Sequence, residues 1–185
     1  MSYDALAESL RLITDGLPDR PVRLSRRCRF APVAVDVDGD VAATRFLRRG
    51  VGCFWDETHL LVARDRGGWR MLGGGGSSSD AAEDPTAAEF ERARDGLAPY
   101  EVAAGGGASV VRDGNRLFPW GGRWVRSAAL LVGGGVAEVT VGGRRLPVAY
   151  HGHLVVVWGS RRPPTVAARD GAGRTVATRT LPDGR

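Results

Sequence analysis

The chain has 185 residues, 43% of them hydrophobic, and all 26 basic residues are arginine. Its longest apolar runs, Ala128–Val132 and Leu154–Trp158, are far shorter than the roughly 18–20 residues of a membrane span, and the hydrophobic content is too high for a disordered chain. Two cysteines are too few for a disulfide framework, and the N-terminus lacks the pattern of a signal peptide. We therefore expect a folded cytoplasmic protein with no membrane span.

The charge is uneven along the chain. Residues 1–76 carry a net charge of +2, residues 77–104 of −5 and residues 105–185 of +8, which add up to the formal +5. This distribution predicts two domains joined by an acidic linker. The absence of lysine indicates a coding bias rather than selection for phosphate binding, because lysine also binds phosphate well. The pI of 10.2 alone therefore does not predict a nucleic-acid partner.

Residues 3–15 have the pattern of one amphipathic helix. Their apolar side chains recur at helical spacing, so they form one stripe. Ser2 is the expected N-cap, and Gly16 is expected to end the helix.

Residues 32–72 then alternate between apolar and polar positions, which predicts an antiparallel meander of four or five strands. Asp38-Gly39 is a hairpin turn signal. The polar run Asp56-Glu57-Thr58 is expected to separate one strand from the next. Helix followed by sheet makes residues 1–72 an α+β domain.

The sheet region carries Gly39-Asp40-Val41-Ala42 and, later, Gly67-Gly68-Trp69-Arg70. In these stretches it resembles the sheet of NTF2-like (cystatin-like) domains, a family of binding proteins, scaffolds, and some isomerases and hydrolases. The resemblance implies a ligand cavity. His59 or Asp36 beside Trp55 would be expected to line it.

Residues 73–107 are predicted to form the linker between the two domains. The run of four glycines and three serines over 73–79 is typical of flexible chain. A short acidic helix is expected to begin with Asp84 as its cap and to end at Gly96. Gly105–Gly107 marks a second break.

Residues 108–182 contain six to eight short stretches of strand-like sequence with turns every 8–12 residues, which predicts a β-sandwich. Gly142-Gly143 is a two-residue hairpin signal. Leu154–Trp158 is apolar at every position, so we expect a strand buried on both faces.

The last part of the chain, 136–182, is similar to immunoglobulin-like modules at the C-termini of uncharacterised actinobacterial proteins. This resemblance implies an immunoglobulin-like fold and no particular activity. The matching stretches are 147–152, 155–158 and 167–174.

The stretch 118–126 combines two tryptophans and two arginines around a glycine pair, and both residue types are enriched at binding hot spots. Together with a later arginine pair it predicts a binding surface. The candidate residues are Trp120, Arg123, Trp124, Arg126, Arg144 and Arg145. In the alternative interpretation, the tryptophans simply cover the end of the sandwich.

His151-Gly152-His153 places two imidazoles two positions apart, a spacing that suits a metal ion. The alternative is a corner where a strand begins, with Gly152 relieving the bend. No motif places a nucleophile beside a base, and no phosphate-binding loop is present. We therefore predict no catalytic residue, no metal site and no cofactor.

The leading hypothesis is a non-catalytic, cytoplasmic protein-interaction or adaptor protein, whose partner is another protein or a second copy of itself. One alternative is a small-ligand binder or enzyme that uses an NTF2-like cavity. The other is nucleic-acid binding through the basic C-terminal domain.

Overall fold

The computed structural model describes residues 3–19, 22, 24–65, 67–80, 88–112 and 123–182. Its helices are α1 (Ala5–Asp15), α2 (Ala88–Arg92) and the 3-10 helix η1 (Ala93–Gly96). Its strands are β1 (Phe30–Asp38), β2 (Val41–Arg49), β3 (Cys53–Ala63), β4 (Trp69–Asp80), β5 (Val102–Val111), β6 (Trp124–Val132), β7 (Glu138–Val141), β8 (Arg144–Leu146), β9 (His153–Trp158), β10 (Thr165–Arg169) and β11 (Thr175–Thr180). None of the helices described combines the length and the apolarity needed to cross a membrane.

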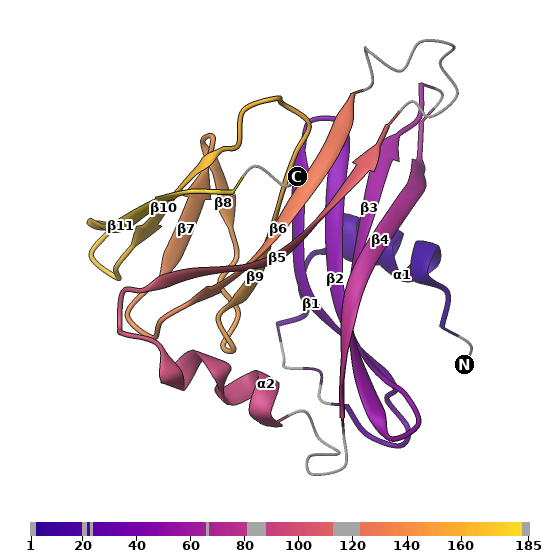
Figure 1. Cartoon of the computed structure of the whole chain (residues 1–185), viewed down its shortest axis with the longest axis horizontal. Helices are drawn as coiled ribbons and strands as arrows, with labels where there is room; N and C mark the ends of the chain where they lie inside the picture. Colours follow the sequence, from indigo (N-terminus) through magenta and orange to yellow (C-terminus); the bar gives the residue numbers. More distant parts are fainter. Residues whose placement is uncertain are drawn as a thin grey trace.

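The strands form three antiparallel sheets (Figure 1). The first sheet has the order β1-β2-β3-β4, the second β5-β6-β9 and the third β11-β10-β7-β8. The expected mainly β protein with one N-terminal helix and antiparallel sheets is therefore confirmed.

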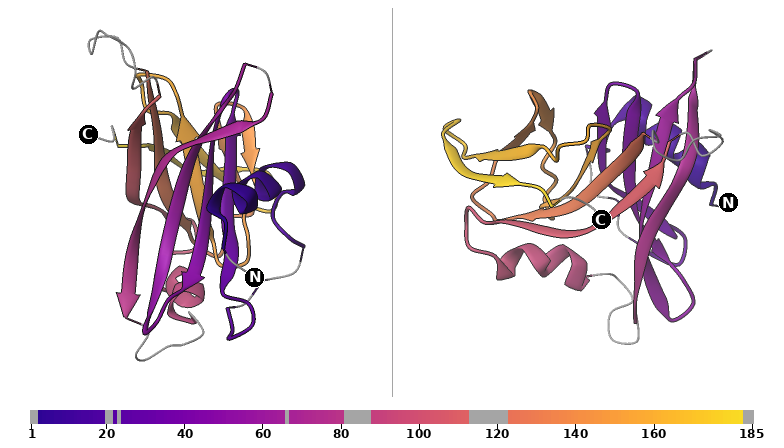
Figure 2. Two further views of the ribbon diagram at one scale, coloured as in Figure 1. Left: turned by 90° about the vertical axis from the view of Figure 1, so that its right-hand side faces the viewer. Right: turned by 45° about the horizontal axis from the view of Figure 1, so that its top comes forward.

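The second sheet lies between the other two, while α1 covers the outer face of the first sheet (Figure 2). Strand β9 is buried at every position, as its sequence predicts. Val155 and Val157 belong to the apolar core shared with the first sheet. Leu154, Val156 and Trp158 belong to the core shared with the third sheet. Because successive side chains of a strand point to opposite faces, one strand completes both cores.

Helix α1 is capped by Asp4, and not by Ser2, which lies outside the described residues. The Asp4 Oδ1 accepts hydrogen bonds from the backbone N–H groups of Leu6 and Ala7 at 3.0 and 3.1 Å. The helix ends as predicted at Gly16, whose φ of +76° suits a residue without Cβ.

Strand β3 is continuous, so the prediction of a break at residues 56–58 is wrong. The acidic residues in this run pair with arginines on the neighbouring strand β2. Asp56 Oδ2 lies 2.5 Å from Arg45 Nη2, and Glu57 Oε1 lies 2.5 Å from Arg48 Nη2. The polar residues that suggested a loop therefore hold two strands together.

Residues 73–79 are not a flexible linker, because they lie in β4 and pair with β3. Their glycines allow close approach of the backbone. A Cβ added at Gly74 would lie 2.3 Å from the Thr58 carbonyl oxygen, and one at Gly76 would lie 2.5 Å from that of Asp56. Such contacts are far below van der Waals distance, so a larger residue would push the strands apart.

The predicted break at Gly105–Gly107 is likewise inside a strand, β5, at a shift of its register with β6. The short helix ends at Gly96 as predicted, while its expected cap, Asp84, lies outside the described residues. The proposed boundaries 1–72, 73–107 and 108–182 stay a prediction. One apolar core contains residues on both sides of the proposed linker.

The hairpin predicted at Gly142-Gly143 is confirmed, with φ values of +55° and +85° between β7 and β8. The Asp38-Gly39 turn between β1 and β2 is also confirmed, with Gly39 at φ +60°. Both turns need the left-handed backbone that glycine adopts without strain.

Candidate functional site

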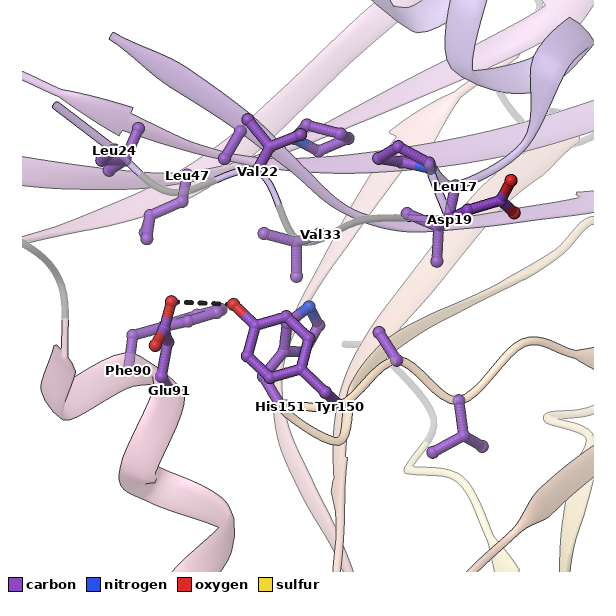
Figure 3. Close-up of a pocket in the computed structure, with 15 residues that line it drawn as sticks. Leu17, Asp19, Val22, Leu24, Val33, Leu47, Phe90, Glu91, Tyr150 and His151 are labelled. Atoms are coloured by element: carbon purple, nitrogen blue, oxygen red, sulfur yellow. Dashed lines mark hydrogen bonds between the residues drawn. The ribbon is translucent and has the colours of Figure 1, made fainter. Parts of the chain in front are cut away.

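A cavity of about 410 Å³ opens between the first sheet and the loop that precedes β9 (Figure 3). The chain before β1 and strands β1 and β2 form one wall, and α2 with residues 148–151 forms the other. Most of the lining is apolar: Leu17, Val22, Leu24, Val33, Leu47, Phe90 and Val148.

Few polar side chains line this cavity. The Tyr150 hydroxyl donates a hydrogen bond of 2.7 Å to Glu91 Oε1, as Figure 3 shows. Asp19 lines the opposite wall. The remaining polar side chain is the imidazole of His151, which is buried beside Tyr150.

The hydrogen bonding of His151 fixes which ring nitrogen carries the proton. The backbone N–H of His153 donates to His151 Nδ1 at 3.0 Å, so Nδ1 is the acceptor. Burial, with the nearby charge of Arg45, lowers the pKa of His151 to about 4, so the ring is neutral at pH 7. Its proton therefore lies on Nε2. Within the described part of the chain, Nε2 has no hydrogen-bond partner, so His151, which lines the cavity, keeps one unused donor.

The backbone turn at residues 149–152 explains the position of His151 directly before β9. Gly152 has a φ of +72°, and a Cβ there would lie 2.6 Å from the Val132 carbonyl oxygen. The Gly152 N–H donates to the Ala149 carbonyl at 2.9 Å, which closes a tight turn before β9. The interpretation of Gly152 as the bend at a strand's beginning is therefore confirmed.

His153 has a structural partner. Its ring stacks on Phe90 with centroids 3.7 Å apart, and its Nε2 donates to the Phe90 carbonyl oxygen at 2.9 Å. Burial lowers the pKa of His153 to about 4, although the Phe90 carbonyl opposes the shift. The residue thus attaches α2 to β9. Among the described side chains, no three His, Cys, Asp or Glu residues gather as metal ligands.

Arg45 provides a buried positive charge beside both histidines. It pairs with Asp56, donates through Nη1 to the Leu154 carbonyl at 3.4 Å, and lies 5.6 Å from the ring centroid of Phe90. Its charge opposes protonation of His151 and His153. The cavity is therefore mainly apolar, with the acidic side chains of Glu91 and Asp19 in its lining and one neutral imidazole.

The predicted binding surface is only partly assembled among the described residues. Trp124 is 41% exposed, and the guanidinium of Arg126 lies 5.9 Å from its ring centroid. Arg123 is exposed directly before β6, and its carbonyl accepts from the Arg112 N–H at 2.7 Å. Trp120 lies outside the described residues.

The two other predicted binding residues form ion pairs within the third sheet and between sheets. Arg144 binds Asp36 and Asp38, with N–O distances of 2.9 and 2.7 Å. Arg145 lies 3.4 Å from Glu138 and is largely exposed. The structure therefore gives Arg144 a role inside the fold.

The residues expected in an NTF2-like cavity do not line the cavity in Figure 3. Asp36 is buried against Arg144 and the Val157 N–H. His59 Nε2 lies 2.9 Å from the Tyr3 hydroxyl, and burial lowers its pKa. Sequence reasoning missed Glu91 and Tyr150, although Tyr150 directly precedes the two histidines it singled out.

Comparison with protein-family models, curated proteins and solved structures found no match to this chain. The two resemblances inferred from the sequence therefore stay predictions.

Proposed function

We propose that this protein binds a small, uncharged, mainly apolar molecule in the cavity of Figure 3. The observation that carries the proposal is the His151 Nε2–H, a donor without a partner among the described residues, in a mainly apolar cavity. Binding sites for small molecules commonly have this composition: apolar walls and a few polar groups that fix orientation.

The polar groups also specify the ligand. The Nε2–H of a neutral imidazole needs a hydrogen-bond acceptor, such as a ketone, ester or amide oxygen. Glu91 and Asp19 line the cavity and disfavour an anion. The volume of about 410 Å³ lies within the range of about 300–1,000 Å³ typical of small-molecule sites.

A fluorescent ketone tests the proposal. Prodan is neutral, has an apolar aromatic body and one carbonyl, and shifts its emission on entering an apolar site. We expect saturable binding of prodan and weaker binding of the anionic dye ANS. Ala149→Trp, which fills the cavity from a half-buried position, should abolish prodan binding.

Two variants at one position isolate the donor. His151→Asn keeps an acceptor for the His153 N–H but loses the donor at Nε2, so prodan affinity should fall about fivefold. His151→Gln carries an amide N–H near the position of Nε2 and should bind more tightly than the Asn variant. Equal prodan binding by the wild type, the Ala149→Trp variant and the His151→Asn variant would refute the cavity as the site.

A second candidate function is protein interaction, with a second copy of the chain as the partner. The observation that favours it is the exposed Trp124 with Arg126 stacked near it, since both residue types are common at hot spots. Sedimentation at rising concentration should show self-association that Trp124→Ala removes. Trp55→Ala is the matched control, because Trp55 is also exposed and lies 5.7 Å from an arginine, Arg48.

Nucleic-acid binding by the basic C-terminal half has less support. Arg144, Arg145 and Arg174 are engaged in ion pairs with carboxylates. The immunoglobulin-like fold of residues 108–182 and the NTF2-like fold of residues 1–72 remain proposals that rest on sequence pattern. The compartment is proposed to be the cytoplasm.

A further inference from the structure

A second cavity, of about 720 Å³, lies on a different part of the surface and is dominated by arginine. Five arginines line it: Arg26, Arg27, Arg29, Arg48 and Arg49. The first three belong to the loop before β1, and the last two end β2. We call it the arginine cavity.

Most of this positive charge is not neutralised within the described structure. Arg48 pairs with Glu57, its guanidinium within 2.5 Å of the carboxylate. Among the described residues, the other four arginines have no carboxylate within ion-pair distance. Glu8, the other acidic group near the Tyr3 ring of the cavity, is paired with Arg11. Like charges held close together repel one another unless an anion joins them.

The backbone holds the arginine loop in place. Ser25 Oγ accepts hydrogen bonds from the backbone N–H groups of Arg27 and Cys28 at 3.2 and 2.9 Å. The Ser25 N–H donates to the Cys28 carbonyl at 2.8 Å, and the Arg49 N–H donates to the Arg29 carbonyl at 2.8 Å. The last of these bonds joins the loop to the end of β2. Because the backbone is already ordered, binding does not carry the entropy cost of ordering it.

One side of the arginine cavity is aromatic and uncharged. The Arg48 guanidinium lies 5.6 Å from the ring centroid of Tyr3 and 5.7 Å from that of Trp55. Burial and the nearby Glu57 raise the pKa of Tyr3, so its phenol stays neutral and does not repel an anion. The cavity thus combines cationic groups with a neutral ring.

We infer that the arginine cavity binds a small molecule that carries two or more linked phosphate groups. Guanidinium groups bind phosphate oxygens through two parallel hydrogen bonds, which suits a cluster of arginines to phosphate. The volume exceeds what one phosphate needs and lies within the range of small-molecule sites. The site is separate from the apolar cavity, whose acidic groups disfavour such a ligand.

Calorimetry with inorganic phosphate, tripolyphosphate and ATP tests this inference on the full chain. Tripolyphosphate should bind at one site per chain, much more tightly than single phosphate, and binding should weaken as salt rises. Tighter binding of ATP than of tripolyphosphate indicates a nucleoside polyphosphate, with the base near Tyr3. Equal affinities indicate that the phosphate chain alone is recognised. Both results support the site.

A pair of double variants with the same change in net charge separates a site from a general charge effect. Arg26→Gln with Arg27→Gln removes two exposed arginines of the cavity, and tripolyphosphate affinity should fall about tenfold or more. Arg161→Gln with Arg162→Gln removes two exposed arginines elsewhere and should have little effect.

Three results would overturn the inference. Tripolyphosphate could bind no more tightly than single phosphate, both double variants could lose affinity equally, or a single-stranded oligonucleotide could bind through Arg161 and Arg162 while tripolyphosphate does not bind. Prodan binding is measured on the same variants. It should not change, which distinguishes failure of this site from failure of the apolar cavity.

Discussion

Arg144 Nη2 lies 2.9 Å from Asp36 Oδ2, so an ion pair links β8 of the third sheet to β1 of the first across 108 positions in sequence. Asp36 also accepts the Val157 N–H of β9 at 2.9 Å, and Arg144 donates to the Val157 carbonyl at 3.1 Å. One carboxylate and one guanidinium therefore connect all three sheets. Burial raises the pKa of Asp36, and the hydrogen bond from Arg144 opposes that rise.

Arg144→Leu should strongly destabilise the fold, because it leaves Asp36 buried without its cation. Asp36 is only 3% exposed, and an unpaired buried charge costs about 3 kcal/mol or more. Urea unfolding of the variant measures this loss. Without Arg144 the raised pKa of Asp36 rises further, so the loss should be smaller at pH 5 than at pH 8.

Arg145→Leu is the matched control, since Arg145 is the neighbouring arginine and its side chain is 79% exposed. Exposed ion pairs contribute about 0–1 kcal/mol, so this variant should resemble the wild type. Equal destabilisation by both variants would contradict a structural role for the Arg144–Asp36 pair.

The protein should lose stability between pH 7 and pH 5 because two of its histidines are buried in the neutral form. The pKa values of His151 and His153 are about 4, against about 6.5 in an unfolded chain. A lowered pKa means that the unfolded state takes up protons first as the pH falls. The loss is then about 2 kcal/mol for each histidine at pH 5.

Replacing either histidine by a residue that does not titrate measures how much of this pH-dependent loss of stability that histidine causes. In His151→Asn, the difference in unfolding free energy between pH 7 and pH 5 should shrink by about 2 kcal/mol. The comparison uses the change with pH, and a change in baseline stability does not affect it. The same pH difference in variant and wild type would show that His151 is not buried as a neutral group.

Gly74→Ala should destabilise β4 by more than an ordinary strand substitution. The added Cβ would lie 2.3 Å from the Thr58 carbonyl oxygen, so the β3–β4 pairing must shift. Gly106→Ala is the control, because no atom lies within 4 Å of the added Cβ and the φ is not left-handed. Thermal unfolding should show a lower Tm for the first variant alone. A flexible segment would tolerate both substitutions.

Asp4→Ala should cost about 1 kcal/mol of stability, because the backbone N–H groups of Leu6 and Ala7 lose their acceptor. Asp4→Asn keeps a side-chain oxygen in place and should remain close to the wild type. Urea unfolding of the two variants tests the cap. A loss of similar size in both would point to the charge of Asp4, not its hydrogen bonds.

Local patterns predicted much of the fold. The unbroken apolar run of β9 and the glycine pair between β7 and β8 are signals that act within a few residues. The part of β4 after residue 72 was missed because four consecutive glycines have the composition of a linker. Their role depends on how closely Gly74 approaches Thr58 on the neighbouring strand, and sequence order alone does not show that distance.

The candidate site was harder to predict, because its walls come from distant segments. Val33, Phe90 and His151 meet only after the sheets pack. The pattern His151-Gly152-His153 attracted a metal hypothesis, yet the two rings differ in function: one lines the cavity and the other stacks on Phe90. Phe90 precedes these histidines by about sixty positions, and no local signal relates them.

The place of β9 between two cores has a consequence for how the chain acquires its structure. Val157 lies 121 positions after Asp36, the residue that binds its backbone. During synthesis the inner apolar face of β1 and β2 therefore lacks its contacts with β9 until β9 has emerged. Contacts so distant in sequence slow folding, and they leave an aggregation-prone apolar surface exposed until they form. Nascent chains halted before His153 should thus depend on chaperones, whereas chains extended beyond Trp158 can close both cores together.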